Sequence, residues 1–147
     1  MLTKSRRRAL LSAVLALVVL GALVLPMTAS AGRFFRRQRD FMFVPRGATE
    51  DYTLQVGQVS VTIPPGALPR GGPVSLRLVT GPEGNFVADF RPEYRFQAPV
   101  TIKFGATEVV YYHQGRQRIP IETSDLDGDG EGGEIESETF SRYSGWF

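Results

Sequence analysis

The sequence predicts an all-β protein: a single antiparallel β-sandwich of about seven to nine short strands, preceded by a cleaved signal peptide. Apolar residues alternate with polar ones at a period of two, as Val59, Val61 and Ile63 do. Glycine and proline clusters interrupt these stretches roughly every eight to twelve residues. After the N-terminal segment, no stretch of ordinary helix length has helical periodicity. These observations favour a sandwich over a helical or mixed fold.

The N-terminal segment, residues 1–31, has the three parts of a secretory signal. Residues 1–8 are basic, residues 9–27 form an apolar run, and Ala29 and Ala31 provide the small side chains of a cleavage site. A membrane-spanning helix needs ~17–25 residues, and the apolar run is about long enough to be such an uncleaved anchor. We therefore expect an exported protein (periplasmic, cell-surface or secreted), with anchoring by an uncleaved N-terminal helix as the alternative. The route, general secretory or twin-arginine, stays open.

Removal of this segment changes the charge of the chain. The full sequence has 17 basic and 15 acidic residues, and four of the basic residues lie in the signal. The mature chain therefore has 13 basic and 15 acidic residues, a formal charge of −2. This balance gives no support to a nucleic-acid partner. The sequence has no cysteine, so it contains neither a disulfide nor a lipid-modified cysteine.

The charge of the mature chain is unevenly distributed. Residues 32–46 contain five arginines and one acid, whereas the chain from Ile121 onward contains eight acids and one arginine. We expect residues 32–50 to form a basic N-terminal arm with a short strand, and residues 51–147 to form the sandwich. Such charges usually belong to a solvated tail and a solvated loop. The other interpretation is an arm that contacts anionic envelope lipid or polymer.

The expected strands follow from the alternation and from the residues that end it. Pro45 ends the first, Gly57 separates the second from the third, and residues 64–66 (Pro-Pro-Gly) end the third. Pro120, inside the eighth, predicts an edge strand or a bulge, because proline cannot donate a ladder hydrogen bond. The nine expected strands are residues 40–44, 53–56, 59–63, 74–78, 86–90, 100–104, 108–113, 118–123 and 134–143.

Four segments carry a resemblance to a known family. In order they read VSVTIPPGALPRGG, VADFRPEYRFQAPVTIKF, EVVYYHQGRQRIPIE and TFSRYSGWF. Together they resemble the ZU-five domain, the β-sandwich of zonula occludens, netrin-receptor and ankyrin proteins, and most closely its bacterial exported relatives. The resemblance covers residues 53–147. It implies an interaction or scaffolding module.

Some members of that family cleave themselves between a phenylalanine and a serine in the last strand, with a histidine assisting. Phe140 and Ser141 stand at the matching place, but Thr139 precedes them where relatives often have histidine. The only histidine is His113, which could act as general base for the Ser141 hydroxyl. The alternative is that His113 and Ser141 are ordinary polar strand residues. No other motif in the sequence points to an enzyme.

The acidic stretch SDLDGDGEGGEIES, residues 124–137, matches the spacing of a calcium-binding loop. Its flanks are expected strands, unlike the paired helices of an EF-hand, and its glycines make ordering costly. The alternative is a solvated hairpin loop, and any calcium affinity would be weak, with Kd about 10⁻⁴–10⁻³ M. The candidate ligands are Asp125, Asp127, Asp129, Glu131 (through its carbonyl) and Glu136.

The sequence thus predicts an exported, non-enzymatic interaction or envelope-structural module. Its partner is an unknown protein or envelope polymer, and it meets the membrane only through the N-terminal segment if that is not cleaved. An exposed strand edge is the natural binding surface, because unpaired backbone groups invite strand addition. A calcium-stabilised adhesion or carbohydrate-binding module is the alternative. A self-cleaving domain, cut between Phe140 and Ser141, comes third.

Overall fold

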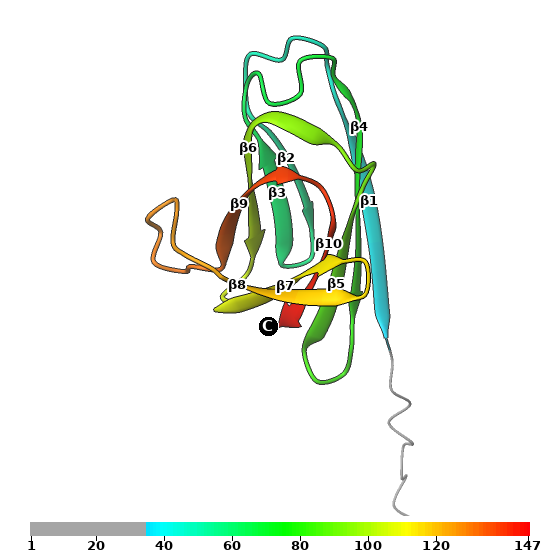
Figure 1. The fold of residues 1–147 in the computed structure, drawn as a ribbon, viewed down its shortest axis with the longest axis vertical. Coiled ribbons are helices and arrows are strands. Elements are labelled where there is room, and N and C mark those ends of the chain that lie inside the picture. The colour runs from blue at the N-terminus through cyan, green and yellow to red at the C-terminus, as the bar shows by residue number, and fades with distance from the viewer. Residues whose placement is uncertain (1–34) are drawn as a thin grey trace, which may run out of the picture. The chain divides into compact units, whose positions relative to one another are not determined.

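The computed structural model describes residues 35–147, and every regular element among them is a β-strand (Figure 1). The signal peptide expected at residues 1–31 lies outside these residues. Within residues 35–147 there is no helix that is long and apolar enough to cross a membrane. The all-β prediction is confirmed for this part of the chain.

The strands form two antiparallel sheets. The six-stranded sheet has the order β1-β4-β5-β10-β7-β8, and the four-stranded sheet has the order β2-β3-β6-β9 (Figure 1). Their bounds are β1 Arg36–Val44, β2 Tyr52–Val56, β3 Val59–Ile63, β4 Gly72–Thr80, β5 Asn85–Arg91, β6 Arg95–Phe104, β7 Val109–Gln114, β8 Gln117–Glu122, β9 Glu134–Thr139 and β10 Arg142–Trp146.

The two edge strands of the six-stranded sheet, β1 and β8, can be compared with the sequence predictions. β1 begins at Arg36, four residues before the expected start, and pairs with β4 along its whole length. The basic segment from Arg36 to Val44 is therefore an edge strand of the sandwich. At the other edge lies β8, which contains Pro120. The edge position predicted from this proline is confirmed, since β8 pairs only with β7.

The last expected strand, residues 134–143, was wrong as a single element. β9 belongs to the four-stranded sheet and β10 to the central part of the six-stranded sheet, so the chain crosses between the sheets at Phe140 and Ser141. The Phe140 amide donates to the Tyr94 carbonyl (3.1 Å), and the Phe90 amide donates to the Ser141 carbonyl (3.0 Å). These two hydrogen bonds fix the crossing, because they satisfy backbone groups of Phe140 and Ser141, which lie between β9 and β10.

The core lies between the two sheets and is rich in aromatic rings. Phe140 is 3% exposed, and its ring packs against Phe90 (5.2 Å between centroids) and edge-on to Phe96 (4.7 Å). Tyr143 is the largest fully buried side chain, and its hydroxyl donates to Ser137 Oγ at 3.2 Å. This bond joins β10 to β9 across the sandwich, so the buried hydroxyl has the partner it needs.

We predict that Phe140→Ala lowers the free energy of unfolding by about 3–5 kcal/mol, because it removes a buried ring from the crossing and leaves a cavity. Urea unfolding followed by tryptophan fluorescence measures this, with Trp146 as the probe. Glu138→Ala is the control, since Glu138 is exposed on β9 two residues away. Equal urea midpoints for the two variants would contradict the role given to Phe140.

Candidate functional site

The acidic stretch is an ordered loop between β8 and β9. Paired backbone hydrogen bonds between Ser124 and Glu134 (2.9 and 3.0 Å) close it. Inside, Asp125 accepts hydrogen bonds from the amides of Gly128 (2.8 Å) and Gly130 (3.0 Å). The Glu134 carboxylate, 3% exposed, accepts from the amides of Leu126 (2.7 Å) and Asp127 (3.0 Å). The carboxylates therefore organise the loop by capping its own backbone amides.

A lysine from β6 stands at the centre of these acids. Lys103 Nζ forms an ion pair with Asp129 and lies 3.5 Å from Asp127, 3.6 Å from Glu131 and 3.7 Å from Glu134. The hydrogen bond to Asp129, more than any other contact, raises the pKa of Lys103, and the same bond lowers the pKa of Asp129. Lys103 thus supplies a positive charge where the sequence motif suggested calcium.

The oxygens best placed for a metal belong to a different set from the one predicted. One carboxylate oxygen from each of Asp125, Asp127 and Glu134 lies within 4.8 Å of the other two. Glu136 is exposed on β9, opposite Thr101, and is outside this group. The spacing of a calcium-binding loop selects Glu136 as its last ligand and passes over Glu134, because that spacing takes no account of where β9 begins. The position of Glu134, which is buried and lies 3.7 Å from Lys103 Nζ, depends on where that strand begins.

The three residues considered for self-cleavage, Phe140, Ser141 and His113, line one hollow of about 390 Å³. The His113 ring, however, is hydrogen bonded to Ser144 Oγ through Nε2 (2.8 Å). Ser141 Oγ donates to the His113 backbone carbonyl (3.2 Å). Burial, followed by the charges of Arg118 and Arg142, lowers the pKa of His113 below its usual value of about 6.5. In this arrangement Ser144, and not Ser141, has the imidazole as its partner.

The outer face of the six-stranded sheet carries most of the exposed arginines of its strands. Core residues such as Val74 and Leu76 fix which side chains point inward, and the alternate positions point outward. Strand register then places one outward residue from each strand in a row across the sheet. The row reads Arg39, Arg77, Asp89, Arg142, His113 and Arg118. We call the surface formed by this row together with Arg37 and Arg91 the arginine face.

Few acids neutralise the arginine face. Asp89 pairs with Arg91 (3.2 Å) and Arg142 (3.5 Å). Arg39 and Arg77 are directly opposite each other in β1 and β4, and neither forms an ion pair within residues 35–147. Like charges placed opposite on neighbouring strands destabilise a sheet. The fold therefore places two arginines that form no ion pair in the described chain at opposite positions of neighbouring strands, with Asp89 next to Arg77 in the row.

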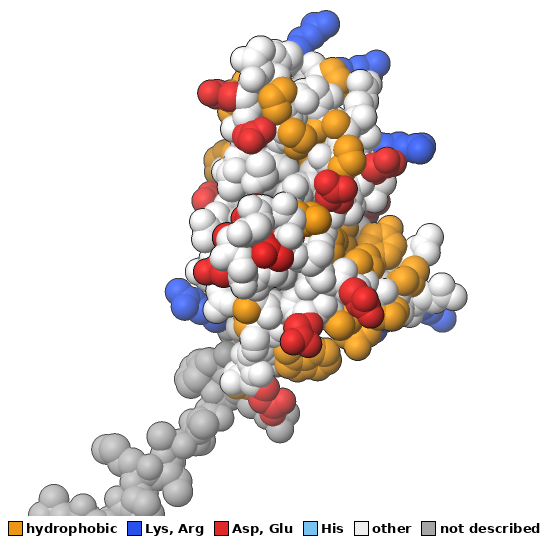
Figure 2. All heavy atoms as spheres, turned by 90° about the vertical axis from the view of Figure 1, so that its left-hand side faces the viewer, with side chains coloured by type: hydrophobic (Ala, Val, Ile, Leu, Met, Phe, Trp, Pro, Cys, Tyr) orange, Lys and Arg blue, Asp and Glu red, His pale blue; other side chains and the backbone are white. Residues whose placement is uncertain are grey.

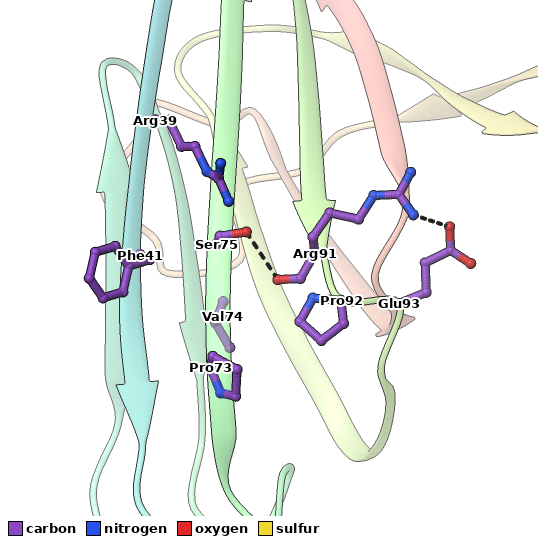
Figure 3. Close-up of a pocket in the computed structure, with 8 residues that line it drawn as sticks. All are labelled: Arg39, Phe41, Pro73, Val74, Ser75, Arg91, Pro92 and Glu93. Carbon is purple, nitrogen blue, oxygen red and sulfur yellow. Dashed lines mark hydrogen bonds and ion pairs between the residues drawn. The ribbon is translucent and has the colours of Figure 1, made fainter.

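A groove of about 730 Å³ opens beside Arg39 (Figure 3). Figure 3 shows the Arg39 side chain reaching from β1 over β4 towards Ser75, while Arg91 turns the other way, to Glu93 (2.7 Å). A smaller hollow of about 240 Å³ lies on the same face and includes Arg77. The groove is lined by Arg39, Phe41, Pro73, Val74, Ser75, Arg91, Pro92 and Glu93, and the smaller hollow by Arg77, Val79, Val87, Asp89 and Arg142.

The opposite side of the molecule has the opposite charge. Lys103 is outward on the four-stranded sheet, next to Glu134 and near Glu136. Figure 2 views the side where the acidic loop projects: acidic side chains are spread over it, and lysines and arginines appear at its margins. A chain with nearly balanced charge thus has one basic face and one acidic face.

In comparisons with known proteins, no family model matches this chain, and neither a curated protein nor a solved structure matches it. The resemblance to the ZU-five domain stays a prediction from the sequence.

We predict that Lys103→Met changes how stability depends on acidity. The pKa of Asp129 is depressed in the folded state, so its interaction with Lys103 stabilises the protein above the ordinary pKa of about 3.8. That stability is lost as the pH falls through the folded-state pKa. The melting temperature of the variant should lie below that of the wild type at pH 7, and the gap should close as the pH falls below about 3.8.

Arg95→Met is the control for this measurement, because it removes a positive charge from the same strand at a residue that forms no ion pair within the described chain. Its melting temperature should follow that of the wild type at every pH. A Lys103→Met curve parallel to the wild type would show that the acidic loop does not depend on the lysine.

Proposed function

We propose that this protein is an exported, non-catalytic binding module that holds an anionic polymer of the cell envelope against its arginine face. The single observation that carries the proposal is the pair Arg39 and Arg77, which lie opposite each other on β1 and β4 and form no ion pair within the described residues, although Asp89 is the next residue of the row. A bound anion would form charge-assisted hydrogen bonds with these guanidinium groups.

The shape of the face suits an extended ligand. Neighbouring strands are about 4.8 Å apart, so a row across six strands extends about 24 Å. Cationic groups along that distance match repeated anionic groups better than a single small anion. The prediction of an exported protein rests on the sequence of residues 1–31 alone, and it supplies the compartment in which such polymers occur.

We predict that Arg77→Glu weakens binding to immobilised polyphosphate about tenfold or more at low salt, because it reverses a charge within the row, next to Arg39. Binding of the wild type should also fall as salt rises, since released counterions drive the association. Arg70→Glu changes the net charge equally but lies in the turn between β3 and β4, outside the arginine face. Biolayer interferometry over a salt series measures both.

If Arg70→Glu and Arg77→Glu weaken binding equally, the affinity depends on net charge and not on the arginine face. If the wild type binds neither polyphosphate nor any carboxylated polymer at low salt, the proposed function fails.

A calcium-stabilised adhesion or carbohydrate-binding module is the second candidate, favoured by the proximity of Asp125, Asp127 and Glu134. Two features weaken it. Backbone amides already occupy oxygens of Asp125 and Glu134, and the Lys103 ammonium lies beside Asp127. A calcium ion would have to displace or repel this lysine.

We therefore predict that millimolar calcium leaves the melting temperature of the wild type unchanged and raises that of Lys103→Met, in which the acids have lost their cation. The measurement is a thermal melt with calcium and then with chelator. Asp127→Asn in the Lys103→Met background is the control, and it should abolish the shift. A rise of several degrees in the wild type would favour the calcium module instead.

A self-cleaving domain is the third candidate, supported by the common hollow of His113, Phe140 and Ser141. The hydrogen bond of the His113 ring to Ser144 places the base away from Ser141. A fragment ending at Phe140 in aged protein, absent from Ser141→Ala, would bring this candidate forward, and a single intact species would remove it.

A further inference from the structure

We propose that the polymer is a carboxylated polysaccharide, one sugar ring of which lies in the groove between Arg39 and Pro92. This inference rests on the proposed function and adds the chemical class of the ligand. The groove presents three kinds of surface together: an unpaired guanidinium, a hydroxyl, and the apolar rings of a phenylalanine and two prolines.

The apolar part of the groove argues for a ring. Phe41 is 75% exposed and lines the groove together with Pro73 and Pro92; Figure 3 shows its ring directed towards the free edge of β1, with the prolines on the β4 and β5 side. Exposed apolar surface is costly in water, and apolar patches mark interaction sites. The C–H face of a sugar ring is apolar enough to cover such a surface, whereas a bare phosphate chain has nothing to place there.

The charged part of the groove fixes the orientation of that ring. Glu93 stands at the β5 side and is paired with Arg91 (2.7 Å), so the only guanidinium on this side already has a carboxylate partner. Arg39 stands at the β1 side with no acidic partner in the described chain, and a guanidinium binds a carboxylate through two parallel hydrogen bonds. The ring would therefore direct its carboxylate to Arg39 and its apolar face to the prolines.

A second hollow makes the ligand a polymer rather than a single sugar. The smaller hollow on the same face also combines arginine with apolar side chains, with Arg77 and Arg142 beside Val79 and Val87, and it includes Asp89, which pairs with Arg142 (3.5 Å). Arg77 is the register partner of Arg39, so each hollow contains one arginine of this pair. Arg77 would hold the carboxylate of a second sugar unit, and linking two units raises the overall affinity.

The test compares four probes by biolayer interferometry on the whole protein: oligogalacturonate, its methyl ester, polyphosphate and vesicles containing anionic phospholipid. Oligogalacturonate should bind, and its methyl ester, which has the same rings without the charge, should bind about tenfold or more weakly. Phe41→Ala should weaken oligogalacturonate about tenfold and leave polyphosphate unchanged. Phe43→Ala is the matched control, since Phe43 is equally outward on β1 but does not line the groove.

The outcomes separate this inference from the proposed function. Polyphosphate binding that depends on Arg77, together with oligogalacturonate binding that Phe41→Ala and Phe43→Ala affect equally, would overturn the sugar-ring inference and keep the anion-binding face. Binding to the vesicles alone would overturn it in favour of a membrane surface. No binding to any of the anions would remove the proposed function itself.

Discussion

The arrangement of this protein depends on the crossing at Phe140. The chain leaves the four-stranded sheet at the end of β9, buries the Phe140 ring between the sheets, and enters the six-stranded sheet as β10. Because β10 lies between β5 and β7, it joins the β4–β5 hairpin to the β7–β8 hairpin. Without this strand the large sheet would be two separate pieces. The Tyr143 hydroxyl, bonded to Ser137 of β9, then holds the two sheets together at the same place.

The arginine face exists because β10 joins the two hairpins into one sheet. Its basic residues come from five strands that are distant in the sequence, and only their common register brings them into one row. Side chains alternate between the two faces of a strand, so the buried residues decide which ones face outward. Because Leu76 and Tyr143 are buried, their neighbours Arg77 and Arg142 must point to solvent. The same alternation directs Lys103 to the outer side of the other sheet, away from the arginines. Packing of the core thus separates the charges of a nearly neutral chain.

Local patterns predicted the strands well, since alternation and breaking residues are local properties, and Pro120 identified an edge. Non-local pairing could not be predicted in this way. The sequence did contain one overlooked sign of the crossing: Ile135 and Phe140 are both buried but five residues apart, which one strand with a period of two cannot accommodate. Glu134 was missed in favour of Glu136 because a linear template cannot show where β9 begins. The ion pairs of Lys103 connect β6 to the acidic loop, which is distant in the sequence, so only the fold reveals them.

The two charged regions differ in how far the protein has already neutralised them, and this difference decides which is the better binding surface. In the acidic loop, the carboxylates accept backbone amides and surround an ammonium, so an arriving cation must break existing interactions before it forms new ones. On the arginine face, Arg39 and Arg77 form no ion pair within the described residues, so an arriving anion displaces water but breaks no ion pair of these two residues. The register of β1 and β4 places these two like charges opposite each other, and Asp89 of β5 is the next residue of the row. An anion bound there would gain charge-assisted hydrogen bonds without first breaking an ion pair, and this makes the arginine face the better binding surface of the two.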